Sequence, residues 1–263
     1  MWRPVAYEGH RFRIVYAVCL DQTRPGEQFY DGLSDSDKAK LNKLFEHLGD
    51  HGKISNKEKF KKIEATDFFE FKSFQIRMPC FFREGALVII THGFRKKGDR
   101  ISPAEIKRAE RIKEEDAKNE CCEGSRSRAK DKFEEFIAND ERRRLYERES
   151  LAFDAAELIS LLMEEKQVSK AELARRVGKS RADITQLLNG SRNMTMHTLA
   201  DLAFALGSRI EFKARACPDQ QTEKTDAQTH YLYRFARHRT RNPYVPTQTE
   251  KVRKLVQSHY LGA

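Results

Sequence analysis

The sequence predicts a small α+β domain, an antiparallel sheet with helices, followed by an all-α helix-turn-helix domain. Three observations support this division. Strand-like runs and amphipathic helices alternate within residues 12–120. Residues 168–190 indicate two short capped helices joined by a tight turn. The length of 263 residues is sufficient for two domains that each bury a core.

The N-terminal elements alternate in type along the chain. Phe12–Cys19 indicates a strand, and Asp35–Leu48 indicates an amphipathic helix because its large apolar residues recur at helical spacing. Three strand-like runs follow, namely Phe68–Lys72, Phe74–Phe82 and Leu87–Phe94. Residues 83–85 form a turn between the last two runs. A charged helix from Ser102 to about Asp116 begins with Ser102 as its cap and Pro103 in its first turn. This order predicts a small α+β domain with a meander.

The residues around these strands resemble the RelE/ParE toxin superfamily, and most closely its HigB-like, phage-derived branch. The resemblance rests on Glu70 and Lys72 in one run, Arg77 in the next, the block HGFRKK over 92–97, and PAEIKRA over 103–109. It covers about residues 12–118. It implies an enzyme that cuts mRNA, typically within the ribosome, by attack of a ribose 2′-hydroxyl on its own 3′-phosphate. Fixed positive charges are the largest expected contribution to such a reaction, and no metal is needed.

The resemblance places the candidate catalytic residues along a groove. Because alternate strand residues share a face, Lys72 and Arg77 are expected to line it together with the end of the third strand. Arg77 and Lys96 or Lys97 stabilise the phosphate in this hypothesis, and His92 has a pKa suited to proton transfer. The full set is Lys72, Arg77, His92, Arg95, Lys96 and Lys97.

Other interpretations of these residues stay open. Residues 95–97 also fit a solvated turn, and His92 on an apolar strand also fits a packed structural histidine. No tyrosine lies between Tyr30 and Tyr146, although family members often carry one near the end of the domain. The identity of the general base is therefore open. ParE-like relatives share the fold but poison gyrase.

The C-terminal half contains paired helix-capping patterns. Ser169 and Glu172 predict a capping box, and Gly178 can adopt the left-handed conformation that ends a helix. Ser180 then caps a second helix with Asp183 three residues later, and Gly190 ends it. The turn is too short for antiparallel helices, so they cross steeply. The alternative is a plain helical hairpin in another bundle.

This stretch resembles the helix-turn-helix of the phage-repressor (XRE/Cro) family, from about Asp154 to Phe212. Asn193–Gly207 matches the helices that complete that domain, with Thr195 as an N-cap and Gly207 as a C-cap. The resemblance implies an operator-binding homodimer whose half-sites lie about one DNA turn apart. It also implies that Arg181 and Gln186 read base edges.

The remaining DNA contacts implied by this resemblance are mainly to phosphates. Lys170 is placed at the first turn of the leading helix, where it contacts a phosphate. Ala182 lies on the outer face of the second helix. Asp183 either accepts from a cytosine amine or only closes the cap on Ser180, and the cap is favoured because a carboxylate repels phosphate. The other phosphate contacts are Lys179, Ser180, Asn189 and Arg192.

The region between the halves predicts a linker and a helical extension. Residues 120–127 fit a flexible linker, and a helix is expected from Arg128 onward. Residues 133–167 resemble the N-terminal extension of HigA-like antitoxins, which docks on the toxin; a solvated helix packed on its own domain is the alternative. We expect a toxin domain over 1–120, a linker and extension over 121–150, a helix-turn-helix domain over 151–216, and a basic tail of unknown role over 217–263.

Composition limits the other classes of function. The net charge is +10 and the pI about 9.3, which favours a polyanionic partner. The longest aliphatic run, 86–90, is far too short for a membrane span, and no signal peptide is evident. The five cysteines form no C-x-x-C, and the histidines show no metal-site spacing. We therefore expect a cytoplasmic protein with no metal and no cofactor.

Taken together, the two resemblances predict a fused type II toxin–antitoxin protein. Its expected partners are operator DNA, mRNA and the ribosome, a contact between its own toxin and antitoxin parts within or between chains, and a second copy in a homodimer. Two alternatives are a transcription regulator with an inactive RelE-like half, and a gyrase poison.

Overall fold

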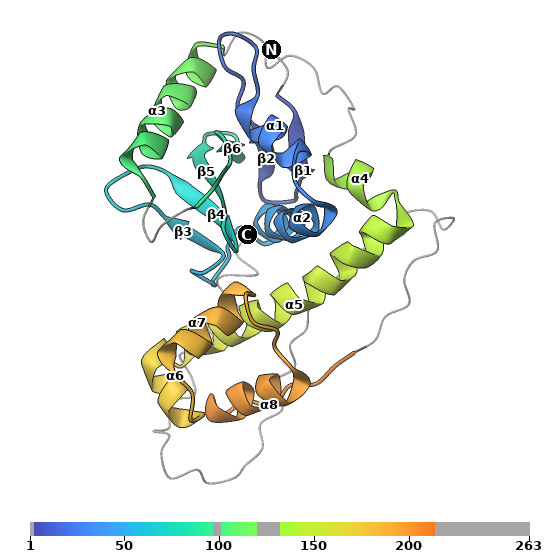
Figure 1. The fold of residues 1–263 in the computed structure, drawn as a ribbon, viewed down its shortest axis with the longest axis vertical. Helices are drawn as coiled ribbons and strands as arrows, with labels where there is room; N and C mark the ends of the chain where they lie inside the picture. Colours follow the sequence, from blue (N-terminus) through green and yellow to red (C-terminus); the bar gives the residue numbers. More distant parts are fainter. Residues whose placement is uncertain (1–2, 97–100, 120–131, 214–263) are drawn as a thin grey trace. The chain divides into compact units, whose positions relative to one another are not determined.

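A mixed β-sheet organises the N-terminal part of the chain (Figure 1). The computed structural model describes residues 3–96, 101–119 and 132–213. Within them the strand order is β1-β2-β6-β5-β4-β3, and only β2 and β6 pair in parallel. The strands are β1 Val5–Glu8, β2 Arg13–Tyr16, β3 Phe60–Lys62, β4 Phe69–Ser73, β5 Ile76–Arg83, β6 Leu87–Ile90 and β7 Phe94–Arg95, which pairs with β5.

Helices cover both faces of this sheet (Figure 1). They are α1 Pro25–Asp31, α2 Asp35–His51 and α3 Pro103–Lys118. One hydrophobic cluster joins α2 to the sheet, with Leu44 and Phe45 against Phe71 and Met78. A second cluster lies on the α3 side of the sheet and includes Ile112 of that helix. The predicted α+β class is confirmed, and the predicted meander is β4-β5-β6.

The strand expected over Leu87–Phe94 is interrupted in the structure. Cys80 of β5 pairs with Ile90 of β6, whereas Arg77 of β5 pairs with Phe94 of β7. A separation of three residues along β5 is therefore matched by a separation of four residues on the opposing segment. One extra residue of this kind is a β-bulge, which bends the strand. The bend lies beside Pro79, which has no amide hydrogen to donate to a ladder.

The C-terminal helices form a separate hydrophobic cluster. They are α4 Lys132–Ile137, α5 Asp140–Glu165, α6 Lys170–Arg176, α7 Arg181–Asn189 and α8 Met196–Ala205. Leu173 of α6, Ile184 of α7 and Leu202 of α8 pack together with the end of α5. The predicted caps Ser169, Ser180 and Thr195 each accept a backbone hydrogen bond at the start of a helix. The all-α helix-turn-helix domain is therefore confirmed.

The helical extension packs on the N-terminal part of the chain. The ring of Phe153 in α5 belongs to the hydrophobic cluster between α2 and the sheet, and it meets His47 edge-to-face with ring centres 4.9 Å apart. The buried ammonium of Lys43 lies 3.4 Å from the carboxylate of Asp154. These contacts favour the docked extension over a helix that packs only on its own domain. A break after Ile137 divides the extension into two helices, because Asn139 caps α5.

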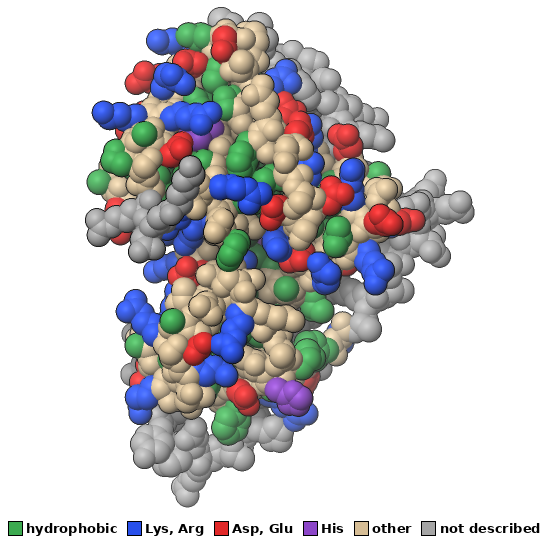
Figure 2. Space-filling view, in the orientation of Figure 1, with side chains coloured by type: hydrophobic (Ala, Val, Ile, Leu, Met, Phe, Trp, Pro, Cys, Tyr) green, Lys and Arg blue, Asp and Glu red, His purple; other side chains and the backbone are tan. Residues whose placement is uncertain are grey.

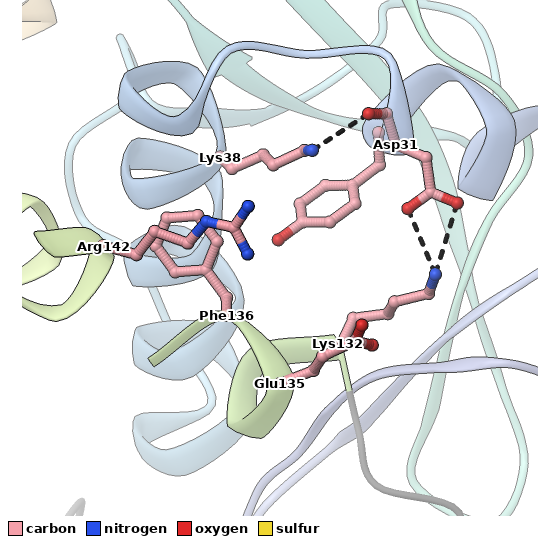
Figure 3. A pocket seen from close by; sticks show the side chains of 7 residues that line it. Asp31, Lys38, Lys132, Glu135, Phe136 and Arg142 are labelled. Carbon is pink, nitrogen blue, oxygen red and sulfur yellow. Dashed lines mark hydrogen bonds and ion pairs between the residues drawn. The ribbon is translucent and has the colours of Figure 1, made fainter. Parts of the chain in front are cut away.

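A small polar pocket lies where α4 and α5 meet α1 and α2 (Figure 3). Lys132 donates to both oxygens of Asp31, at 3.1 and 3.2 Å. Arg142 donates to Asp35 at 3.1 Å. Ion pairs therefore surround the apolar contact that Phe136 makes with Ala39 beside it.

Several predictions fall outside the described residues. They are the linker over 120–127, the tail over 217–263, and Lys97 of the candidate catalytic set. Within the part of the chain that the structure describes, no helix is long and apolar enough to cross a membrane.

Candidate nucleic-acid-binding sites

A cluster of charged side chains lies on the face of β4 and β5 opposite to α2. Lys72 of β4 pairs directly with Arg77 of β5 across the two strands. Glu70 lies two residues before Lys72, and because strand side chains alternate between faces it shares this side of the sheet. Phe94 of β7 is the neighbour of Arg77 on the other side. The sheet thus brings together Lys72 and Arg77, as the sequence predicts.

Arg77 is held in place by the backbone of the β4–β5 hairpin. Its Nη1 donates to the carbonyl of Phe74 at 2.6 Å and to that of Ile76 at 2.7 Å. Its Nε lies 3.5 Å from the carboxylate of Glu70. Burial raises the pKa of Glu70, while the charges of Arg77 and Lys72 oppose the rise. The cluster therefore contains a cation pair and a carboxylate with a raised pKa.

Lys72 turns toward the segment that precedes β3. Its ammonium donates to the carbonyl of Lys57 at 3.1 Å and lies 3.5 Å from the carboxylate of Glu58. Its side chain is only 11% exposed. Burial lowers the pKa of Lys72, and the nearby carboxylates of Glu58 and Glu70 oppose this shift. The ammonium of Lys72 is therefore already engaged by a carboxylate and a backbone carbonyl.

His92 is fully buried behind the cluster. Its Nε2 lies 3.0 Å from the carboxylate of Glu105 in α3, and its Nδ1 lies 3.0 Å from the hydroxyl of Thr91. Burial, with a smaller effect of Arg108, lowers the pKa of His92 to about 4. These contacts favour the packed structural histidine over a base that reaches a substrate.

Of the two described basic residues that follow the bulge, Arg95 and Lys96, only Lys96 lies near the charged cluster. The guanidinium of Arg95 is 55% exposed and lies 3.2 Å from Asp37 of α2. The amide of Lys96 donates to the carbonyl of Gln75 at 2.8 Å, and the charge of Lys96 acts on Glu70. Lys96 thus lies near the cluster, whereas Arg95 pairs with a helix on the other face.

The second helix of the helix-turn-helix presents its predicted reading face to solvent. Arg181, Ala182 and Gln186 of α7 are exposed. Among the described residues, the guanidinium of Arg181 has no ion pair or hydrogen bond. Lys179, in the turn before α7, is exposed as well. The side chains that the sequence predicts to contact bases and phosphates therefore point away from the helical core.

The carboxylate of Asp183 completes the N-terminal cap of α7. The hydroxyl of Ser180 accepts from the amide of Asp183, and the Asp183 carboxylate accepts from the amide and hydroxyl of Ser180. Those bonds lower the pKa of Asp183. Arg192 also pairs with this carboxylate. The capping role is present, and Arg192 is tied to α7.

A polar segment over residues 53–59, here called the docking segment, contacts the helix-turn-helix. Asn56 donates to the carbonyl of Leu188 at 2.8 Å, and Lys59 donates to that of Asn189 at 2.8 Å. These carbonyls end α7, where backbone acceptors lack helical partners. The Asn189 side chain accepts from the amide of Ser191 at 2.8 Å. No sequence signal marked this segment, because its partners lie more than a hundred residues away in the chain.

Two further contacts fix the docking segment to α5 and α6. The carboxylate of Glu157 in α5 accepts from the amides of Ser55 and Asn56, the latter at 3.0 Å. Lys170 of α6 forms an ion pair with Glu58. Lys170, a predicted phosphate contact, is therefore engaged with the same carboxylate that approaches Lys72.

On one face of the molecule the described basic residues are dispersed rather than gathered in a patch. On the face in Figure 2, Lys and Arg side chains alternate with Asp and Glu over both parts of the chain. Charge alone therefore does not mark a binding site, and the two sites rest on local geometry. Among the described residues, no three His, Cys, Asp or Glu side chains are grouped so as to hold a metal ion.

Two segments of the chain match known families. Residues 28–114 match the family described as phage-derived protein Gp49-like, which is a toxin family of the RelE/HigB type. Residues 159–211 match the Cro/C1-type helix-turn-helix DNA-binding domain. None of the curated proteins matches the chain. Both resemblances predicted from the sequence are confirmed, and each candidate site lies within its matching segment.

Proposed function

We propose that this chain, which joins a Gp49-like toxin segment to a Cro/C1-type helix-turn-helix domain, is a fused toxin–antitoxin protein that cleaves mRNA and represses its own operator. The observation that carries the first activity is the Lys72–Arg77 pair beside Glu70. Two fixed cations and one carboxylate on a sheet face suit phosphodiester cleavage.

The cleavage uses the 2′-hydroxyl of the RNA as nucleophile. Arg77 and Lys72 hold the phosphate and stabilise the charge that develops on it. Glu70 takes the proton from the 2′-hydroxyl, which then bonds to phosphorus, and the 5′-oxygen leaves with a proton from solvent. The products are a 2′,3′-cyclic phosphate and a free 5′-hydroxyl. Glu70 replaces His92 in this role because both ring nitrogens of His92 are engaged by Thr91 and Glu105, whereas one carboxylate oxygen of the likewise buried Glu70 has no hydrogen-bond partner among the described residues.

The antitoxin part restrains the toxin part by direct docking. α5 packs on α2 through Phe153, and the docking segment is held by Glu157 and by the end of α7. Glu58 of this segment approaches Lys72, so a phosphate must displace a carboxylate to bind there. Ribosomal mRNA is the proposed substrate, because single-stranded RNA exposes the 2′-hydroxyl and phosphate that this chemistry needs.

Operator binding uses the exposed face of α7. Arg181 and Gln186 suit guanine and adenine edges in the major groove. Repressors of this architecture bind as dimers to half-sites about one DNA turn apart, so we propose a homodimer on a palindromic site.

Expression in cells tests the two activities separately. Residues 1–120 are expected to stop growth and to cut mRNA, and Arg77→Ala is expected to abolish both. Lys62→Ala, which removes an exposed cation from β3, serves as the matched control. Normal growth with intact mRNA would reject the nuclease. Residues 128–216 are expected to prefer DNA upstream of the gene over random DNA, and equal binding would reject autorepression.

A second candidate function is a transcription regulator with an inactive RelE-like half. It is favoured by the burial of His92 and by the engagement of Lys72 with Glu58. The same expression experiment separates the two, since an inactive half leaves growth unchanged while DNA binding persists.

A further inference from the structure

The tip of the β4–β5 hairpin presents an aromatic ring to solvent. Ser73 pairs with Ile76, so the loop consists of Phe74 and Gln75 alone. Phe74 is 61% exposed and has φ +52°. The first position of a two-residue hairpin loop with positive φ is where glycine is preferred. A bulky side chain in this conformation is strained.

The strained conformation is supported by residues of the candidate RNA site. The carbonyl of Phe74 accepts from Nη1 of Arg77 at 2.6 Å. The carbonyl of Gln75 accepts from the amide of Lys96 at 2.8 Å. The side chain and backbone that surround the proposed phosphate position thus also fix the loop that carries the ring.

Neither folding nor solubility accounts for phenylalanine at this position. An exposed ring contributes little hydrophobic stabilisation, since most of its apolar surface remains in water. The backbone conformation would be less strained with glycine. Strain that the surrounding structure maintains tends to occur at functional sites, and here the strained residue lies in the loop that joins the strands of Lys72 and Arg77.

We propose that Phe74 is a base-stacking residue, which holds a nucleobase of single-stranded RNA whose phosphate lies on Lys72 and Arg77. This inference rests on the proposed RNA cleavage and adds the group that recognises the substrate. Every base has a π-face, so aromatic side chains beside cationic grooves are the common means of binding single strands. Because Lys and Arg side chains attract the phosphates of a nucleic acid, the neighbouring cations favour RNA over an apolar protein as the partner of this ring.

Binding of short RNA by the full chain tests the proposal. The probes are oligoadenylate and oligouridylate of equal length, and the variants are Phe74→Gly and Phe74→Trp. Glycine removes the ring and adopts a positive φ without strain, so the folded variant should be at least as stable as the parent. We expect Phe74→Gly to weaken oligoadenylate binding by on the order of tenfold. Tryptophan should retain the affinity.

The preference between the two RNAs is the second measurement. Purines stack more strongly than pyrimidines, so the parent should prefer oligoadenylate, and Phe74→Gly should lose this preference. Phe204→Ala, which removes an 84% exposed ring from α8, controls for the loss of an exposed aromatic group. Binding and preference unchanged in Phe74→Gly would overturn the proposal while the nuclease stands. No RNA binding by the parent chain and none by its Glu58→Gln variant, which removes the charge that competes at Lys72, would overturn both.

Discussion

Lys170 of α6 forms an ion pair with Glu58 of the docking segment, so a predicted DNA-contacting lysine is bonded to the toxin part of the chain. The same carboxylate lies 3.5 Å from Lys72. Burial raises the pKa of Glu58, but its bonds with these two lysines outweigh that effect and the pKa is lowered overall. Glu58 is therefore ionised at neutral pH and occupies both lysines, which a phosphate would have to win from it under the proposed function.

Glu58→Gln is expected to strengthen DNA binding by the full chain about two- to fivefold, because it frees Lys170 from a half-buried ion pair. Titration of upstream DNA at several salt concentrations measures the effect. Glu64→Gln makes the same charge change at an exposed residue and should leave the affinity unchanged. In a Lys170→Ala background, Glu58→Gln should have no effect; an equal gain there would contradict the competition.

Arg181→Ala is expected to reduce binding to the operator by about 1–3 kcal/mol and to relax the sequence preference. Its guanidinium is exposed on α7, where the sequence predicts a contact with a base edge. Lys179→Ala is the comparison, and it should weaken binding equally on all sequences while lowering the salt slope by about one. Parallel titrations of operator and random DNA measure both. A uniform loss for Arg181→Ala would show that it contacts only phosphate.

Glu70→Gln is expected to slow RNA cleavage by about 10²–10⁴-fold, the usual contribution of a general base. Because burial raises the pKa of Glu70, the rate of the parent should increase with pH as this carboxyl loses its proton. The cleavage rate of residues 1–120 as a function of pH measures this dependence. Glu64→Gln should follow the parent profile, and a Glu70→Gln variant that retains both rate and profile would exclude Glu70 as the base.

Glu157→Ala is expected to destabilise the full chain by about 1–3 kcal/mol, because it leaves the amides of Ser55 and Asn56 without their acceptor. The urea midpoint of unfolding measures the loss. Glu165→Ala removes an exposed carboxylate from the same helix and should change the midpoint little. Equal midpoints for the two variants would show that Glu157 does not hold the docking segment.

His47 is expected to make stability fall with acidification. It lies between His51 and Phe153, and burial, with the charges of His51 and Lys43, lowers its pKa to about 3. Between this value and the unfolded pKa of about 6.5, the unfolded chain binds a proton that the folded chain excludes. Unfolding free energy should therefore drop by about 1–2 kcal/mol from pH 7 to pH 5 through this group.

His47→Gln tests the assignment, because glutamine does not titrate. The variant should show a smaller drop between pH 7 and pH 5 in urea unfolding, whereas the exposed His197→Gln should behave like the parent. A drop of the same size in His47→Gln would assign the acid sensitivity to other groups.

The sequence predicts elements well where local chemistry decides them. Ser169, Ser180 and Thr195 cap their helices as expected, because a cap needs only the next three residues. At Ser169 the reciprocal half of the box is replaced, since Glu172 bonds to Arg175 and Arg176 instead. The three-residue strand β3 and the α1 helix carry too little pattern to be recognised and exist through tertiary packing.

The site residues divide in the same way. Cross-strand pairing of Lys72 with Arg77 follows from the hairpin and was predictable. His92 is buried and contacts Glu105 of α3, and strand periodicity does not report a contact with a helix later in the chain. The contact of Lys170 with Glu58 joins residues 112 positions apart and has no local signal. The sequence predicts a strand that begins at Phe74, whereas Phe74 lies in the hairpin loop, because residue type alone does not indicate its positive φ.

The helix α5 contributes to two hydrophobic clusters at once. Phe153 belongs to the cluster of the sheet and α2, and Ile159 to that of the helix-turn-helix. Six residues of helix separate them by about 9 Å along the axis. One inserted residue between them would turn one side chain about 100° relative to the other. A flexible tether affects only how often two linked parts meet. A shared helix also fixes the rotation of one set of side chains relative to the other. In this chain the number of residues between Phe153 and Ile159 therefore sets how the two clusters are oriented about the α5 axis.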